Sequence, residues 1–247
     1  MKTALVTGAA RGIGLATTHR LLKMGFQVAM VDNDSAELAK SKGLAGTTLF
    51  DTDVADPNQV DSLKAALKDQ WPHLTALVNN AGLADFGPIE DTSFARWRAV
   101  MANNLDAPFL MTQAFTPMLK VAKGAVVNIT SISGLRASTL RVAYGTSKAA
   151  LAHLTLQQAA ELGEYGIRVN AVAPGPVRTK LAMAVHTPEI ITAYHDALPL
   201  NRYGSEDEIA AAISFLLSED ASFITGQILA ADGGFEATGI GLPALRD

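Results

Sequence analysis

Residues 3–14 of this chain have the sequence TALVTGAARGIG, in which a short apolar run leads directly into three glycines. The run predicts a β-strand, whereas residues 12–25 carry the apolar spacing of an amphipathic helix. Gly8, Gly12 and Gly14 therefore lie between a strand and a helix. In this context the backbone N–H groups of a glycine turn and of the helix N-terminus bind a phosphate.

Each glycine has a separate role in such a loop. Gly8 permits the turn, Gly12 lets the backbone approach a pyrophosphate, and Gly14 allows the helix to pack closely on the strand. The spacing departs from the usual G-x-G-x-x-G, and a tight strand-to-helix turn favours glycine even without a ligand. The loop alone leaves both a nucleotide site and a purely structural turn open.

The same alternation of short β-branched runs and longer helical patterns continues along the chain. It predicts βαβ units on a parallel sheet, and the absence of a linker or repeat favours one domain over residues 1–247. We therefore expect an α/β fold of the doubly wound Rossmann type, with seven parallel strands and helices on both faces. The expected strands are 3–7, 27–32, 47–51, 74–80, 124–130, 167–174 and 226–232. The expected helices are 12–25, 35–43, 60–70, 92–120, 144–162 and 205–218.

One stretch, about residues 178–203, has no clear pattern and follows the sixth strand. Long connections at strand ends often carry function, so we expect a substrate-binding lid there. His186 and His195 lie in this stretch with Met183 and Tyr194. The two histidines either face a substrate or belong to a solvated surface.

Composition excludes several classes of function. The chain has 247 residues, 49% of them hydrophobic and 18% charged, with a net charge of -4 and no cysteine. No basic patch for nucleic acid or an anionic membrane is expected, and no run is long enough for a membrane span or a signal-peptide core. The lack of cysteine excludes disulfides and thiolate metal ligands and suits a reducing compartment. We expect a cytoplasmic protein that binds neither nucleic acid nor membrane.

Polar side chains gather at further strand ends. Asp32 ends the second expected strand, Asp53 follows the third, and the fourth ends in residues 79–82, NNAG. Open α/β sheets bind ligands at the carboxyl ends of their strands, and a carboxylate at the end of the second strand can accept hydrogen bonds from a ribose. Asp32 could also cap a helix. Asp51, Asp53 and Asp56 have no nearby histidine or EF-hand spacing, so no metal is expected.

Residues 131–148, SISGLRASTLRVAYGTSK, contain the most specific arrangement. Tyr144 and Lys148 are four apart on an expected helix and therefore share a face. A unit charge at about 4 Å and an effective dielectric of about 20 is worth roughly 4 kcal/mol, close to three pKa units. We therefore expect Lys148 to lower the pKa of Tyr144, so that the phenol can act as a base, and Ser131 lies thirteen residues upstream of this pair.

Taken together, these motifs resemble those of the short-chain dehydrogenase/reductase family, and the resemblance covers nearly the whole chain. Its elements occur in family order and at family spacing: TGAARGIG (7–14), NNAG (79–82), Asn104 in MANNLDAPF, Ser131, YGTSK (144–148) and PGPVRT (174–179).

The resemblance implies an NAD(P)-dependent oxidoreductase that transfers a hydride between a secondary alcohol or polyol, or the corresponding ketone, and a nicotinamide. It also implies a homotetramer. The catalytic residues it implies are Asn104, Ser131, Tyr144 and Lys148, with Asn104 holding a water on the lysine side. The cofactor-binding residues it implies are Gly8, Arg11, Gly12, Ile13, Gly14, Asp32, Asp53, Val54, Asn80, Ala81, Gly82, Tyr144, Lys148, Pro174, Gly175, Val177 and Thr179.

The preferred nucleotide depends on two opposing residues. Arg11 stands where NADP-preferring members of the family often carry a basic residue, and Asp32 stands where NAD-preferring members carry an acid. Asp32 would lie against the ribose and repel the 2′-phosphate of NADP. An ion pair between that phosphate and the exposed Arg11 would contribute little binding free energy. We expect NAD, with NADP less favoured.

Two alternative functions and the role of Arg141 remain open. A 3-oxoacyl-carrier-protein reductase would use NADPH and need a basic docking surface, of which Arg11 is the one hint. A silent dinucleotide sensor or scaffold would be expected to lack one of the catalytic residues. Arg141, three residues before Tyr144, either points at an anionic substrate group or is an ordinary surface arginine.

Overall fold

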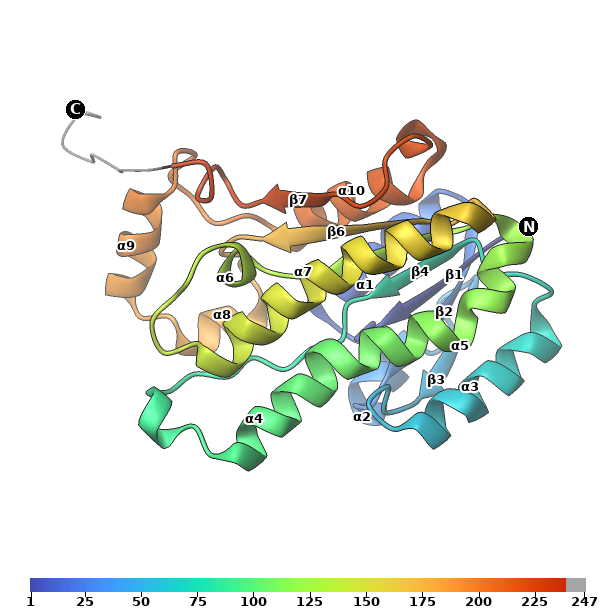
Figure 1. Cartoon of the computed structure of the whole chain (residues 1–247), viewed down its shortest axis with the longest axis horizontal. Coiled ribbons are helices and arrows are strands. Elements are labelled where there is room, and N and C mark those ends of the chain that lie inside the picture. The colour runs from blue at the N-terminus through green and yellow to red at the C-terminus, as the bar shows by residue number, and fades with distance from the viewer. Residues whose placement is uncertain (239–247) are drawn as a thin grey trace.

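In a computed structural model of the chain, residues 1–238 are described, without the side chains at 181, 184 and 185. Seven parallel strands form one sheet in the order β3-β2-β1-β4-β5-β6-β7 (Figure 1). The predicted doubly wound α/β fold is confirmed. The strands are β1 Lys2–Thr7, β2 Phe26–Asp32, β3 Thr47–Asp51, β4 Ala76–Asn79, β5 Ala125–Ile129, β6 Arg168–Pro174 and β7 Ile228–Ala231.

Helices connect the strands and cover both faces of the sheet (Figure 1). The order of the strands reverses direction at β1, where the chain crosses from β3 back to β4. Such a reversal opens a crevice at the carboxyl ends of the strands. The helices are α1 Gly12–Lys23, α2 Ser35–Leu38, α3 Pro57–Gln70, α4 Phe94–Met101, α5 Ala107–Ala122, α6 Ile132–Leu135, α7 Val142–Leu162, α8 Lys180–Val185, α9 Pro188–Ala197 and α10 Glu206–Leu217.

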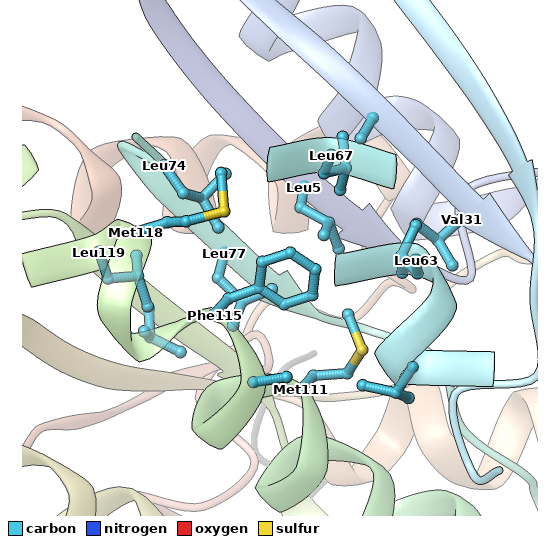
Figure 2. Close-up of a cluster of buried hydrophobic side chains, with 14 of the residues drawn as sticks. Leu5, Val31, Leu63, Leu67, Leu74, Leu77, Met111, Phe115, Met118 and Leu119 are labelled. Atoms are coloured by element: carbon cyan, nitrogen blue, oxygen red, sulfur yellow. The ribbon is translucent and has the colours of Figure 1, made fainter. Parts of the chain in front are cut away.

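Alternate residues of each central strand enter two separate cores. In β1, Leu5 packs with α3, α5 and α7, whereas Ala4 and Val6 pack with α1 and α10. Figure 2 shows the first core, in which Phe115 of α5 lies among leucines and methionines. Since side chains alternate across a strand and both faces are covered, the strands are almost wholly apolar, as a parallel sheet requires.

A buried hydrogen-bond network joins the sheet to the helices of one face. The amide of Asn79 on β4 donates to Asn128 on β5 at 2.8 Å and to Thr112 on α5 at 3.2 Å. Asn128 in turn donates to Thr155 at 2.9 Å and Gln158 at 3.1 Å, both on α7. These buried hydrogen bonds connect β4 and β5 to α5 and α7 and so fix the helices relative to the strands.

Two segments differ from the expected pattern. The expected helix 92–120 is two helices, α4 and α5, joined by a π-helical turn at Ala102–Asp106. Residues 178–203, expected to be irregular, contain α8 and α9, which begin at the capping residues Thr179 and Thr187. These helices are too short to show an apolar period, although a threonine followed by Pro188 is a helix-start signal.

Within residues 1–238, no helix has both the length and the apolar character that crossing a membrane requires. Residues 233–247 continue past the last strand, and from the sequence this tail is predicted to pack across a subunit contact or the pocket; its residues 239–247 lie outside the described residues.

Gly14 shows how closely α1 packs on β1, and its substitution tests this contact. A Cβ at Gly14 would lie 2.0 Å from the carbonyl oxygen of Gly8, so the backbone would have to move. We expect Gly14→Ala to lower the free energy of unfolding in urea by about 1–3 kcal/mol, as overpacking does. Gly163, with φ -59° and nothing within 4 Å of a Cβ, is the control.

Gly163→Ala should leave the protein unchanged or stabilise it by about 0.4–1 kcal/mol, because it removes only freedom of the unfolded chain. Equal stability of the Gly14→Ala and Gly163→Ala variants would contradict the close contact between α1 and β1.

Candidate active site

A cavity of about 450 Å³, here called the glycine-loop cavity, lies at the carboxyl ends of β1 to β4. It is lined by side chains and backbone of residues that were predicted to lie at the ends of separate strands. Its lining includes Leu83 and Asn103, which were not predicted, as well as the predicted Ile13 and Thr179. The predicted residues that line it are Gly8, Arg11, Gly12, Ile13, Asp32, Asp53, Val54, Asn80, Ala81, Gly82 and Thr179.

The glycine loop leaves room beside a helix N-terminus. Gly8 and Gly12 have φ of +61° and +59°, a region that favours glycine. A Cβ at Gly12 would meet only Glu206, at 3.6 Å, so the loop surface is open there. Asn80 holds the loop by donating to the carbonyls of Thr7 and Gly8 at 2.9 and 3.0 Å. Open backbone at the start of α1 fits a dinucleotide pyrophosphate.

Asp32, at the end of β2, is fixed in the wall of this cavity by the backbone. One carboxylate oxygen accepts from the N–H of Ala10 at 3.0 Å, and the other accepts from the N–H of Asp34 at 3.0 Å. Arg11 forms an ion pair with Asp34, which also caps α2. The arginine charge is therefore directed at Asp34, while Asp32 lines the cavity.

A second cavity of about 270 Å³, the tyrosine cavity, adjoins the first. Ser131, Tyr144 and Lys148 all line it, so the structure brings the three predicted residues together. The two cavities share part of their lining, and a ligand in one can reach the other. The shared residues are Ile13, Asn80, Gly82, Leu83 and Thr179.

Lys148 is buried on α7 and reaches the end of β5. Its side chain is 4% exposed, and its ammonium donates to the carbonyl of Ile129 at 2.7 Å. The nitrogen lies 5.9 Å from the centre of the Tyr144 ring. Burial lowers the pKa of Lys148 to about 8, because desolvation disfavours the charged form.

The pKa of Tyr144 differs from the sequence expectation. Burial raises it above the ordinary value of a phenol, while hydrogen bonding to Ser131 and the charge of Arg141 act in the opposite direction. The desolvation of the phenol outweighs these contributions, and the pKa of the nearby lysine is itself depressed. The phenol in this structure therefore holds its proton at neutral pH, as a donor to a carbonyl oxygen must.

Asn104 lies beside this centre without lining either cavity. It is fully buried in the π-helical turn, and its amide accepts from the N–H of Leu83 at 2.7 Å. Its nitrogen donates to the carbonyl of Leu83 and to the hydroxyl of Ser147, both at 3.0 Å. The extra residue of a π turn is what aims the side chain inward, and such turns are frequent at functional sites.

Two glycines that the sequence analysis did not single out allow Ser131 to approach Tyr144. A Cβ at Gly134 on α6 would lie 2.7 Å from the backbone carbon of Lys148, and one at Gly145 would lie 3.0 Å from the carbonyl oxygen of Ser133. Glycine inside a helix such as α7 costs stability, so its presence at Gly145 was the available signal of a close contact.

The segment after β6 closes the other side of the tyrosine cavity. Pro174, Gly175, Val177 and Thr179 line the cavity, and His186 is a further lining residue. Tyr194 also lines it, whereas His195 does not. Of the two histidines, therefore, His186 faces the cavity. Its Nδ1 contacts the hydroxyl of Tyr203 at 2.9 Å.

No cluster of three or more histidine or acidic side chains suited to a metal ion occurs in the described part of the chain. Asp53 instead accepts from the N–H of Ala55 at 2.9 Å, and Asp56 caps α3. The carboxylates of Asp53 and Asp56 thus accept backbone hydrogen bonds in the segment between β3 and α3.

Comparisons with known proteins agree with this geometry. A family model described as enoyl-(acyl carrier protein) reductase matches residues 8–236. The chain is 36% identical over 243 residues to 2-(S)-hydroxypropyl-CoM dehydrogenase 3 of Xanthobacter autotrophicus, covering 94% of this chain and 95% of the relative. It is 37% identical over 238 residues to galactitol 2-dehydrogenase (L-tagatose-forming) of Cereibacter sphaeroides, covering 94% of each.

A solved structure of 4-hydroxyisoleucine dehydrogenase complexed with NADH superposes with a TM-score of 0.91 at 31% identity, over 96% of this chain and 100% of that one. Sequence and structure thus match the same group of proteins over nearly the full length, which confirms the resemblance seen in the motifs. The chain belongs to the short-chain dehydrogenase/reductase family of nicotinamide-dependent oxidoreductases.

Proposed function

We propose that this protein is an NAD(H)-dependent dehydrogenase that interconverts a secondary alcohol or polyol and the corresponding ketone. The observation that carries the proposal is the meeting of Ser131, Tyr144 and Lys148 in a cavity continuous with the glycine-loop cavity. The relatives that act on galactitol and on a hydroxypropyl compound support secondary alcohols as the substrate class.

When bound, the nicotinamide accepts or supplies the hydride. Tyr144 transfers the proton between its phenol oxygen and the substrate oxygen, and Ser131 hydrogen-bonds that same oxygen as its charge changes. Lys148, whose ammonium is anchored on Ile129, binds the nicotinamide ribose hydroxyls and supplies positive charge beside the phenol. Asn104 positions this group through its hydrogen bonds to Leu83 and Ser147. We further propose that it holds a water on the lysine side.

Alcohol oxidation and ketone reduction place opposite demands on Tyr144. Reduction uses the protonated phenol, which is the form that burial favours here. Oxidation uses the phenolate, so its rate should increase as the pH approaches the pKa of the tyrosine.

The remaining predicted residues have roles in cofactor and substrate binding. We propose that Thr179 binds the nicotinamide carboxamide and that Pro174, Gly175 and Val177 lie along the ring, while residues 178–203 form a lid of the single domain 1–247. Their position around the tyrosine cavity supports this. The pyrophosphate and adenosine would contact Gly8, Arg11, Gly12, Ile13, Gly14, Asp32, Asp53, Val54, Asn80, Ala81 and Gly82.

The proton-transfer role of Tyr144 is tested by Tyr144→Phe, with Tyr165→Phe as a matched control on the surface. We expect Tyr144→Phe to lower kcat by about 10²–10⁴-fold, the range of general acid–base catalysis. NADH affinity, followed by fluorescence titration, should stay nearly unchanged, since the ring itself remains. Turnover of alcohols, polyols and ketones is measured from the absorbance of NADH and NADPH. A kcat equal to that of the wild type would refute the mechanism.

Preference for NAD follows from how Asp32 and Arg11 are held. Both oxygens of Asp32 accept backbone N–H groups, so the carboxylate is not free to turn away from the ribose. Arg11 is already paired with Asp34 and would have to leave that ion pair to bind a phosphate. A 2′-phosphate would therefore meet a fixed negative charge without a compensating arginine.

We expect the wild type to prefer NAD over NADP in kcat/KM by at least about tenfold, which corresponds to about 1.4 kcal/mol. Asp32→Ala should lose most of this preference, because it removes the repulsion. Asp61→Ala, which makes the same change of charge on the outer surface of α3, should keep it. Wild-type turnover of NADP as efficient as that of NAD would overturn the assignment and favour the carrier-protein reductase alternative.

Exposed apolar side chains on two groups of elements support assembly into a homotetramer. The first, on α4, α5 and α7, includes Phe94 at 76% exposure and Val121 at 69%. The second, around α10 and β7, includes Phe223, which is fully exposed, and Phe215. Apolar surfaces of this kind usually mark contacts between proteins.

We expect light scattering at micromolar concentration to give the mass of a tetramer. Phe109→Glu, at another exposed position on α5, should reduce it to a dimer by placing a charge in one contact. Gln70→Glu, at the exposed end of α3, should leave the mass unchanged. A monomeric wild type would refute the proposed assembly.

A further inference from the structure

Arg141 is held at the wall of the tyrosine cavity by both its backbone and its side chain. Its backbone forms a bridge with Gly87, whose N–H donates to the carbonyl of Leu140 at 3.0 Å. Its guanidinium carbon lies 3.7 Å from the ring centre of Phe86 and 5.3 Å from that of Tyr144. Stacking on an aromatic face orients a guanidinium while leaving its N–H edge available.

No carboxylate among the described residues forms a salt bridge with this guanidinium. Two other arginines do have such partners: Arg96 pairs with Asp85 at 2.6 Å, and Arg136 pairs with Glu236 at 3.1 Å. The described residues that line the tyrosine cavity include no aspartate or glutamate. Arg141 thus presents a half-buried positive charge to a cavity without negative charge.

The other basic groups of the cavity are otherwise engaged. Lys148 donates to Ile129 and is the proposed ligand of the cofactor ribose. His186 contacts Tyr203, and burial together with the charge of Arg141 lowers the pKa of its imidazole, so it is neutral at neutral pH. Arg141 is the cation of this cavity that remains for a substrate.

We propose that Arg141 binds an acid group of the substrate, so that the enzyme acts on hydroxy acids and the corresponding oxo acids. This inference rests on the proposed function, because it places the acid group in the molecule whose hydroxyl meets Tyr144 and Ser131. A guanidinium binds a carboxylate through two parallel N–H···O bonds, and the partly desolvated wall strengthens them. Because the guanidinium carbon lies 5.3 Å from the centre of the Tyr144 ring and both residues line the same cavity, one small molecule can contact both side chains.

The test compares each hydroxy acid with its own primary amide, which has nearly the same shape and no charge. The panel contains aliphatic and alicyclic hydroxy acids, for example 3-hydroxybutyrate and 4-hydroxypentanoate, together with simple polyols. The variants are Arg141→Gln, Arg141→Lys and the control Arg20→Gln, which removes an exposed arginine at the far end of α1. Thermal unfolding establishes that each variant is folded.

The readout is the ratio of kcat/KM for acid and amide. Any effect of Arg141 on the protonation of Tyr144 acts on both compounds and cancels in this ratio. We expect the wild type and Arg20→Gln to favour acids by at least about tenfold, since hydrogen bonds to charged groups contribute about 1.5–3 kcal/mol. Arg141→Gln should bring the ratio close to one, and Arg141→Lys should retain part of it because the charge remains.

Two results would overturn the inference while leaving the proposed function intact. One is turnover of polyols or amides as efficient as that of the acids, and the other is an acid-to-amide ratio that Arg141→Gln does not change. If no compound is turned over with either nucleotide, the proposed function is refuted. The anion site can then still be tested by measuring the binding of the same acids and amides by calorimetry. Acid binding lost in Arg141→Gln would still support the anion site, and equal binding would exclude it.

Discussion

A buried ammonium group sets the geometry of the active site. Lys148 can lie in the interior because the carbonyl of Ile129 accepts from it at 2.7 Å, and an unpaired ammonium there would be costly. The carbonyl belongs to the last residue of β5, so this bond holds α7 beside the end of that strand. Tyr144, one turn earlier, is thereby placed against Ser131, which follows the same strand. Gly134 and Gly145 make this approach sterically possible.

The rest of the framework holds α7 in that position. Asn128, on β5, binds Thr155 and Gln158 at the opposite end of the helix from Tyr144. A helix bonded to one strand at two separate points can neither slide nor rotate without breaking a buried hydrogen bond. The π turn adds a third attachment, because Asn104 donates to Ser147 at 3.0 Å. The relative positions of Tyr144, Lys148 and Asn104 are therefore set by the sheet and the helices that pack on it.

The parts of this structure that follow from local patterns could be predicted from the sequence. Strand periodicity and the glycine loop gave the sheet, and polar residues at strand ends gave most of the cavity lining. The π turn could not be predicted, because one extra residue in a helix leaves no mark on the apolar pattern. The helices after β6 are too short for periodicity, and the pKa of Tyr144 depends on burial that only the assembled fold creates. The setting of Arg141 depends on Gly87 and Phe86, which are distant in the chain.

The two ends of the cleft carry opposite charges that are held in different ways. Asp32 is fixed by two backbone N–H groups, so its charge acts on whatever occupies the adenosine end. Arg141 is fixed by stacking on Phe86, which leaves its hydrogen-bond donors free. A fixed carboxylate discriminates between ligands by repelling those that carry a negative charge. A stacked guanidinium discriminates between ligands by the hydrogen bonds that it donates to an acid group. Tyr144 lies between them and is not independent of the second charge, because the guanidinium of Arg141, 5.3 Å from the ring centre, lowers the pKa that burial of the phenol raises. A change at the Arg141 end of the cleft therefore also acts on the phenol, whereas Asp32 is not among the groups that shift its pKa.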